Sequence, residues 1–286
     1  TNNDGDNYNV AVGYYAGQAI TSGVQNTIIG GLAGDALTSG AYNTVLGYKA
    51  LSAEDTGGKN TAIGWNAMTN LDAGGNGNNV SVGFNSSNAM TTAVASTIVG
   101  SEAGRAITTG NYNTVLGYLA LSSEDEGSHN AAIGYLALED QDAGADAYNV
   151  AIGSSAGKQV TTGKENIFIG GNVADSITTG IRNVAIGHAA LQTEDEHGYN
   201  VAIGNRALQT QNAGADAYNV AVGSNAGQAV TTGTYNTLVG GLAGDAITSG
   251  NTNVALGYQA LTSETQGDRN VAIGVSALEV QNNTSN

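Results

Sequence analysis

One stretch, Asn200-Val201-Ala202-Ile203-Gly204, contains the pattern that decides the fold of this chain. The pattern is an apolar run between an asparagine and a glycine, and it occurs sixteen times. Its first closing glycines are Gly13, Gly30, Gly47, Gly64 and Gly83. Three equal steps are therefore followed by a slightly longer one, and this series of four repeats along the chain as a super-repeat. A helical-hairpin repeat needs about 33 residues or more, roughly twice the step between these glycines. The short period predicts a β-solenoid in which each step is one coil.

Each copy of the pattern predicts a strand of four or five residues that enters a turn. The asparagine is present in fifteen copies, with Ser96 as the exception, and the glycine never varies. The asparagines could form a row of ligand-binding amides, or a ladder in which each amide bonds to neighbouring coils and to corner backbone. We favour the ladder. The residues assigned this structural role are Asn9, Asn26, Asn43, Asn60, Asn200, Gly13, Gly30, Gly47, Gly64 and Gly204.

The predicted fold is all-β, a parallel β-solenoid or β-roll of sixteen coils that forms a single domain over residues 1–286. Its super-repeats span about 9–78, 79–148, 149–218 and 219–286, and residues 1–8 match the end of a preceding coil. After the glycine, two coils of each super-repeat carry a large apolar residue late, as in Leu37, and two carry it early, as in Leu51. These residues predict a second apolar wall. Because the chain begins and ends within a coil, we expect open β-edges that another domain or the next molecule covers.

The composition indicates a thin aliphatic core and limits the possible partners. The chain has 43 glycines, 6% aromatic residues, no proline and no cysteine. The lack of proline suits strands that all donate to a ladder, and the lack of cysteine excludes disulfides and thiolate metal sites. An excess of 24 acidic over 8 basic residues argues against nucleic acid and anionic membranes as partners. No apolar run approaches the length that a membrane-spanning helix needs, so we expect no membrane insertion.

The strands are apolar on both faces. Because side chains alternate along a strand, Val201 and Ile203 share one face, while Asn200 and Ala202 share the other. A strand that is apolar on both faces is normally buried on both. One face can line the core of the coil, and the other needs a partner. The simplest partner is a second copy of the chain about a symmetry axis.

The run Asn60-Thr61-Ala62-Ile63-Gly64-Trp65-Asn66-Ala67 resembles the head repeat of trimeric autotransporter adhesins, and similar runs occur in phage tail-fibre and other virion proteins. The resemblance covers nearly the whole chain. It implies a homotrimer of left-handed parallel β-rolls, located outside the cell on a cell surface or virion, that attaches to a host or matrix. Head coils of that family are usually shorter than the coils expected here, and no neck, coiled-coil stalk or membrane anchor is recognisable. The general crossover rule also favours right-handed connections.

Aromatic residues often follow the strand glycine. They are Tyr14, Tyr48, Trp65, Phe84, Tyr118, Tyr135 and Tyr258. Rings that point outward could stack on sugar rings, whereas rings that face neighbouring coils or subunits would be packing residues. We favour packing, and keep glycan stacking as the alternative.

Two further patterns raise ligand-binding hypotheses. Asp140, Asp142 and Asp146 lie in one acidic loop and offer carboxylates to calcium, a hard cation that takes six or more oxygens. A solvated turn is the favoured alternative. Pairs such as Thr21-Ser22 suggest an ice-binding face, but they are interrupted after every second coil. Turn hydroxyls that satisfy local backbone explain these pairs better.

No pattern points to catalysis. His129, His188 and His197 have no repeated acid or nucleophile partner, and no metalloprotease or serine-hydrolase motif is present. We therefore expect no enzymatic activity and no cofactor. The first functional hypothesis is a structural or adhesive fibre segment, from a phage tail fibre or a bacterial surface adhesin, that contacts copies of itself and a cell-surface glycan or matrix. The alternatives are an extracellular filament that stacks head to tail and, third, an ice- or calcium-binding solenoid.

Overall fold

The computed structural model describes residues 7–282 and contains strands, turns and no helix within them. The chain divides into two compact units, Thr1–Ala147 and Tyr148–Asn286. The strands of the first unit are β1 (Val10–Val12), β2 (Thr27–Ile29), β3 (Thr44–Leu46), β4 (Thr61–Ile63), β5 (Val80–Val82), β6 (Thr97–Val99), β7 (Thr114–Leu116) and β8 (Ala131–Ile133). Those of the second are β9 (Val150–Ile152), β10 (Ile167–Ile169), β11 (Val184–Ile186), β12 (Val201–Ile203), β13 (Val220–Val222), β14 (Thr237–Val239), β15 (Val254–Leu256) and β16 (Val271–Ile273).

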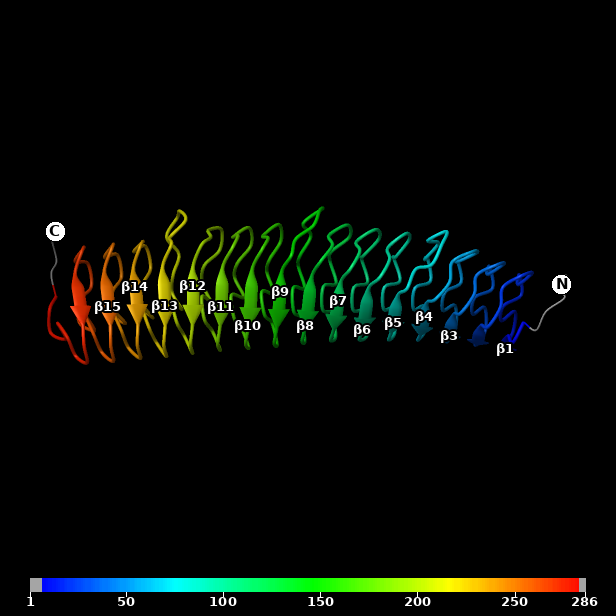
Figure 1. The fold of residues 1–286 in the computed structure, drawn as a ribbon, viewed down its shortest axis with the longest axis horizontal. Coiled ribbons are helices and arrows are strands. Elements are labelled where there is room, and N and C mark those ends of the chain that lie inside the picture. Colours follow the sequence, from blue (N-terminus) through cyan, green and yellow to red (C-terminus); the bar gives the residue numbers. More distant parts are fainter. Residues whose placement is uncertain (1–6, 283–286) are drawn as a thin grey trace. The chain divides into compact units, whose positions relative to one another are not determined.

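Within each unit the strands pair in parallel, in chain order and without a register shift (Figure 1). Val10 pairs with Thr27 in β1 and β2, and Val201 pairs with Val220 in β12 and β13. Each coil contributes one strand, so the predicted parallel β-solenoid of sixteen coils is confirmed. The partial coils expected at the two ends fall largely on residues 1–6 and 283–286, which lie outside the described part of the chain.

The strands have three residues each, fewer than the four or five predicted. The asparagine before each strand is not part of the strand, because its backbone amide bonds to a side chain and not to the backbone of the adjacent strand. The Asn26 amide, for example, donates to Oδ1 of Asn9 at 2.9 Å. The closing glycine is excluded because its φ lies between 126° and 144°, a conformation that only glycine adopts easily. A Cβ at Gly117 would also lie 2.2 Å from the carbonyl oxygen of Gly134. The invariance of the glycine therefore has a steric and a conformational cause.

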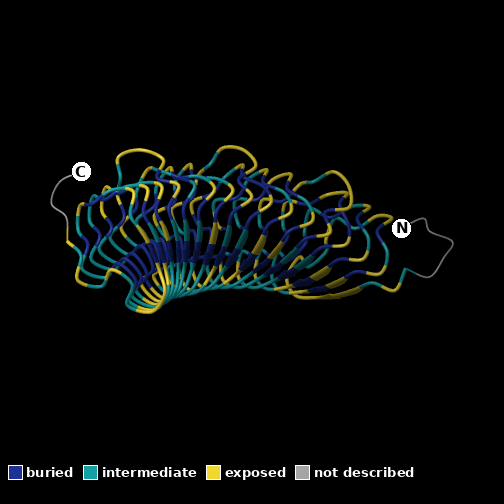
Figure 2. Cartoon of the chain, turned by 60° about the vertical axis from the view of Figure 1, so that its left-hand side comes forward, coloured by how far each residue is buried: buried dark blue, intermediate teal, exposed yellow. Residues whose placement is uncertain are grey.

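The third position of the pattern faces the core. Ile28, Phe168 and Ala202 are fully buried there, and the small residue three positions after the glycine is buried in every coil between the first and the last. The second wall is also present, and its two sequence forms fill the same kind of space. In the form with the late apolar residue, Gly104 leaves room for Ile107, because a Cβ at Gly104 would lie only 2.9 Å from Cδ1 of Ile107. In the form with the early apolar residue, the buried Leu121 stands at the position equivalent to Gly104. Figure 2 shows the buried residues lining the inside of the coils and the exposed residues at the turns.

The corners contain a feature that the sequence did not reveal. In every coil, the second residue after the glycine and the residue before the asparagine have positive φ, and none of these residues is glycine. Tyr15 and Tyr42 are examples, with φ of 54° and 63°. Each such residue carries a conformational cost of about 1 kcal/mol or more. The cost is offset by hydrogen bonds between coils, such as the one from the Tyr42 amide to the Val24 carbonyl at 3.1 Å.

Candidate functional site

The asparagine column forms a ladder inside the coils. Asn236 donates its backbone amide to Oδ1 of Asn219 at 2.7 Å and its Nδ2 to the Gly250 carbonyl at 2.8 Å. Its own Oδ1 accepts the backbone amide of Asn253 at 2.9 Å. Asn236 is fully buried, and both of its polar side-chain atoms are already used. This is the geometry that the structural interpretation requires. Asn60 departs from it, because its Oδ1 accepts the Asn79 amide at 3.2 Å but its Nδ2 has no partner.

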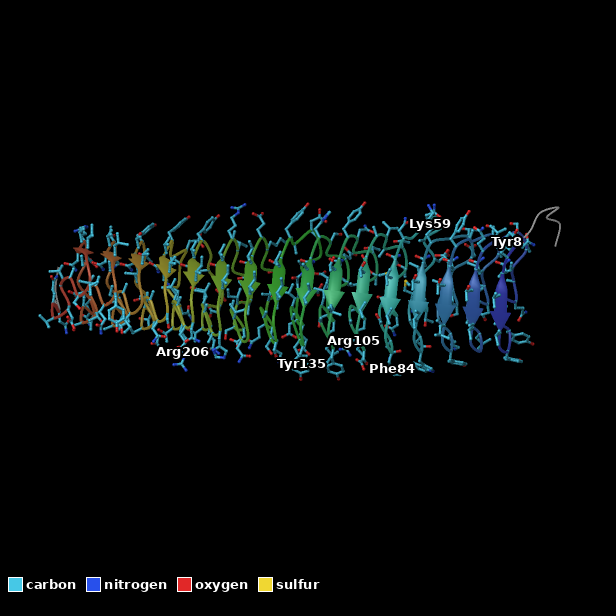
Figure 3. All side chains as sticks on the ribbon, turned by 60° about the horizontal axis from the view of Figure 1, so that its bottom comes forward. Tyr8, Lys59, Phe84, Arg105, Tyr135 and Arg206 are labelled. Atoms are coloured by element: carbon cyan, nitrogen blue, oxygen red, sulfur yellow. The ribbon has the colours of Figure 1, made fainter. Side chains whose placement is uncertain are left out.

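The aromatic residues after the glycine are exposed and also stack on one another. The ring centroids of Tyr48 and Trp65 are 6.3 Å apart, those of Trp65 and Phe84 are 5.0 Å apart, and those of Tyr118 and Tyr135 are 5.9 Å apart. In each of these pairs the rings are within 18° of parallel. Figure 3 shows Phe84 and Tyr135 along one edge of the first unit. The rings of Tyr14 and Tyr15 are in contact but tilted by 40°, with centroids 4.1 Å apart, and Tyr258 is half exposed.

A second aromatic column lies at the opposite edge of the strands, where Figure 3 labels Tyr8. Its members precede the strand asparagine and include tyrosine in seven coils: Tyr8, Tyr42, Tyr112, Tyr148, Tyr199, Tyr218 and Tyr235. Tyr199, Tyr218 and Tyr235 form a continuous stack with centroids 4.9 and 5.5 Å apart. This column was not predicted from the sequence. The preference for tyrosine before asparagine was visible, but it had no assigned place until the coils were aligned in space.

Two rungs of the first column carry no ring although both of their neighbours do: Gly31, between Tyr14 and Tyr48, and Ser101, between Phe84 and Tyr118. Ser101 lies in the coil between those of Phe84 and Tyr118, and backbone hydrogen bonds of 2.8 and 3.2 Å hold the three coils in register. Two coil spacings of about 4.8 Å therefore separate the rungs of Phe84 and Tyr118. Both rings are about half exposed. A flat ring placed at the rung of Ser101 would be about 5 Å from each, which is a normal aromatic stacking distance.

A buried glutamate recurs once in each super-repeat, at Glu54, Glu124, Glu194 and Glu264. Glu124 shows how such a carboxylate is stabilised: Oε1 accepts the Gly127 amide at 2.7 Å, and Oε2 accepts Nε2 of Gln141 at 2.8 Å and the Ala143 amide at 3.2 Å. Glu54 likewise uses both oxygens, at 2.6 and 3.1 Å. Burial raises the pKa of the Glu54 carboxyl, against the opposing effect of these two backbone hydrogen bonds.

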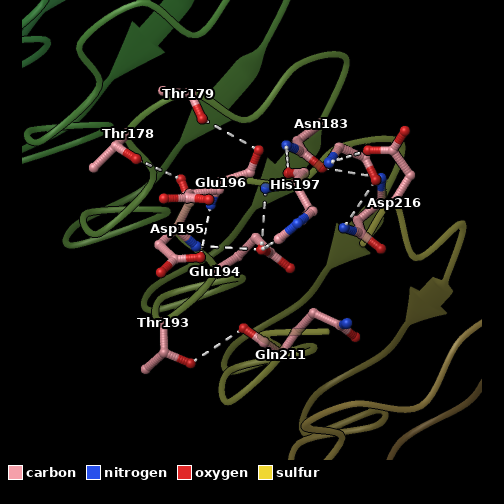
Figure 4. Close-up of polar contacts among 12 residues, drawn as sticks. Thr178, Thr179, Asn183, Thr193, Glu194, Asp195, Glu196, His197, Gln211 and Asp216 are labelled. Atoms are coloured by element: carbon pink, nitrogen blue, oxygen red, sulfur yellow. Dashed lines mark hydrogen bonds and ion pairs between the residues drawn. The ribbon is translucent and has the colours of Figure 1, made fainter. Parts of the chain in front are cut away.

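The third copy differs from the others (Figure 4). Oε1 of Glu194 accepts only long hydrogen bonds, 3.2 Å from the Asp195 amide and 3.3 Å from the His197 amide, and its Oε2 has no partner. Nδ1 of His197 lies 3.4 Å from Oε1. Burial raises the pKa of the Glu194 carboxyl to about 7, although hydrogen bonding and charge from His197 act in the opposite direction. Glu194, Asp195 and His197 can bring one ligand atom each within 4.8 Å of one another.

The calcium candidates are not brought together as predicted. Asp142 lies in a cluster with Glu124 and Asp125, and Asp140 and Asp146 are not members of it. Residues close in the loop sequence are separated by its turn, whereas residues about one coil apart become neighbours. The carboxylates of this cluster raise the pKa of Asp142 in addition to the larger effect of desolvation. A similar cluster joins Glu54, Asp55 and Asp72.

The threonine hydroxyls satisfy backbone of the next coil, not local backbone as predicted. Oγ1 of Thr161 donates to the Thr178 carbonyl at 3.2 Å, and Oγ1 of Thr178 donates to the Asp195 carbonyl at 2.9 Å. These hydroxyls therefore act as links between coils.

The surface of residues 7–282 offers no pocket. Within the same residues, no helix is long and apolar enough to cross a membrane. No protein-family model matches the sequence, and no curated protein is significantly similar to it. Function is therefore inferred from the residues on the surface of the coils.

Proposed function

We propose that this chain is a structural and adhesive segment of an extracellular fibre, carried on a cell surface or a virion, and that it acts as a homotrimer. The observation that supports the proposal best is the outward face of the strands. The fourth position of the pattern is Val, Ile or Leu in every coil. Leu46 and Leu116 at this position are 45% and 50% exposed.

This face has the properties of an interface. The second and fourth positions of the pattern point away from the core, and in-register pairing places each apolar side chain next to the corresponding one in the adjacent coil. Contiguous apolar surface of this kind is uncommon on monomers and typically marks a contact with another molecule. A second copy of the chain presents the same column with the same spacing, so it can match the face along its length.

The trimeric state and the left-handed coil come from the resemblance to adhesin head repeats. The adhesive role is supported by the two exposed aromatic columns, because rings at the edges of the strands remain accessible when the strand faces pack together. In the gap at Ser101, a sugar ring can take the place of the missing aromatic rung and contact Phe84 and Tyr118 on its two sides.

The oligomeric state is tested by charging the strand face. We expect the wild-type protein to have three times the chain mass in sedimentation equilibrium. Leu116→Lys should shift it towards monomer, because a lysine in the interface would be desolvated without a partner. Thr109→Lys, at an exposed turn away from the strand face, is the matched control and should remain trimeric. A monomeric wild-type protein would contradict the proposal, and indefinite fibres in electron micrographs would support the head-to-tail filament instead.

The adhesive role is tested by filling the gap. Ser101→Tyr adds the missing rung, so we expect it to abolish binding to the sugars that wild-type protein retains on a glycan array, without changing the trimer. Ser224→Tyr is the control, because its neighbouring rungs carry Asn205 and Gly241 and offer no pair of rings. Equal glycan binding by the wild type and Ser101→Tyr would contradict the proposal that a sugar ring binds at the rung of Ser101. Failure of the wild type to bind any glycan would contradict sugar recognition as a whole.

A further inference from the structure

We propose that the third super-repeat contains a binding site for a divalent transition-metal ion such as Zn²⁺, with Glu194, Asp195 and His197 as protein ligands. The inference is independent of the fibre function. It rests on a comparison among the four copies of one buried glutamate, because three copies show how the chain satisfies this group by hydrogen bonding and one copy departs from them.

In the other copies, donors of the chain neutralise the carboxylate. Glu124 receives three hydrogen bonds from two amides and one glutamine, divided between its two oxygens. Glu264 receives three from consecutive backbone amides at 2.7 to 3.2 Å. Glu194 receives only the two long bonds to Oε1. A buried carboxylate oxygen without a donor costs about 1–3 kcal/mol or more, so the site requires another positive partner.

In the third copy, a residue type that can bind metal ions stands where the other copies have the glycine that donates the shortest hydrogen bond to the glutamate. Gly57, Gly127 and Gly267 each donate a short backbone hydrogen bond of 2.6 to 2.7 Å to the glutamate three residues earlier. The equivalent residue in the third copy is His197. Its Nδ1 is buried, accepts and donates no hydrogen bond, and lies 3.4 Å from Oε1 of Glu194. In the third copy this backbone hydrogen bond is lengthened to 3.3 Å, and an imidazole lies beside the carboxylate.

The ligand set indicates the class of cation. One imidazole nitrogen and two carboxylates suit zinc and its neighbours in the first transition series, whereas calcium prefers a shell of oxygens. Zinc binds such atoms at about 2.0–2.2 Å, so small rotations of the three side chains are needed to bring the ligand atoms closer than 4.8 Å. Asp195 and His197 are partly exposed, which gives the ion access and leaves a coordination position for water.

Gln211 is the competing partner for the free oxygen. Its equivalent Gln141 donates to Glu124, and Nε2 of Gln211 is itself without an acceptor. Oε1 of Gln211, however, accepts Nδ2 of Asn219 at 2.6 Å, which commits this side chain to the asparagine ladder. The two explanations make different predictions for variants at His197 and Gln211.

Calorimetric titration of the full 286-residue chain with ZnCl₂ at neutral pH, in excess Mg²⁺ and Ca²⁺, tests the site. We expect one zinc ion per chain. His197→Gly, which restores the residue of the other copies and so preserves the fold, should weaken zinc binding by at least about tenfold, a loss that even outer-shell changes can produce. His188→Ala, at an exposed position outside the proposed ligand set, should bind like the wild type.

Gln211→Leu distinguishes the competing explanation, because leucine is the residue of the first copy at this position. We expect it to retain zinc binding. Absence of zinc binding by the wild type, displacement of zinc by calcium, or unchanged affinity in His197→Gly would each overturn the proposal. Loss of zinc binding in Gln211→Leu would show that the glutamine, not the proposed triad, controls the site. None of these outcomes depends on whether the protein is a fibre segment.

Discussion

Replacement of one asparagine in the ladder should cost a large part of the stability of its coil. Asn236→Ala removes the Nδ2 donor of the Gly250 carbonyl and the Oδ1 acceptor of the Asn253 amide, whose bonds are 2.8 and 2.9 Å long. Both of these backbone groups belong to buried residues. Each buried group left without a partner costs about 1–3 kcal/mol, so we expect the free energy of unfolding to fall by about 2–6 kcal/mol.

The chain provides a matched control at the single coil without the asparagine. Oγ of Ser96 accepts the Asn113 amide at 3.2 Å, so a serine keeps the acceptor of the ladder and loses the donor. Asn236→Ser should therefore cost about half as much as Asn236→Ala, or about 1–3 kcal/mol.

Urea unfolding compares the two variants, and amide hydrogen exchange at Asn253 locates the loss. Local opening is expected because each coil of a solenoid is stabilised mainly by its neighbours. Equal losses for serine and alanine would refute the two-bond account. A loss below about 0.5 kcal/mol for alanine would refute the ladder as a source of stability.

Two further variants test the corners and the buried charges. Gly117→Ala places a Cβ 2.2 Å from the Gly134 carbonyl oxygen at a φ of 144°. We expect it to lower the free energy of unfolding in urea by about 3 kcal/mol or more. Gly75→Ala is the control, because its Cβ meets no atom within 4 Å, and it should change stability by less than about 0.5 kcal/mol. Burial raises the pKa of Glu54 above its ordinary value of 4.5, so the folded state binds this proton more tightly than the unfolded state does. The protonated carboxyl therefore stabilises the fold most at a pH below 4.5, and this stabilisation is lost as the pH rises. The free energy of unfolding of the wild type relative to Glu54→Gln should therefore decrease as pH rises above about 4.5, and a difference that is constant or increases with pH would contradict the raised pKa.

The sequence by itself determined the period, the number of coils, the parallel register and the ladder role of the asparagines. It could do so because a solenoid repeats one local problem: each coil contacts mainly the coils before and after it, so every position faces copies of itself. Gly204 and its equivalents must satisfy the same close backbone contact in each coil, and that constraint is legible as an invariant residue. The buried third position also follows a simple alternation once one face is known to be inside.

Only the tertiary structure decided which face points inward and which residues meet across coils. Alternation defines two faces for Val201 and Ala202 but does not say which one the corners turn towards the core. Stacking of Tyr199 on Tyr218, and the grouping of Asp142 with Glu124, join residues about one coil apart and depend on the path of the turns. The unsatisfied oxygen of Glu194 was equally hidden, because the sequence shows His197 in place of the glycine of the other copies but not which donors reach the carboxylate.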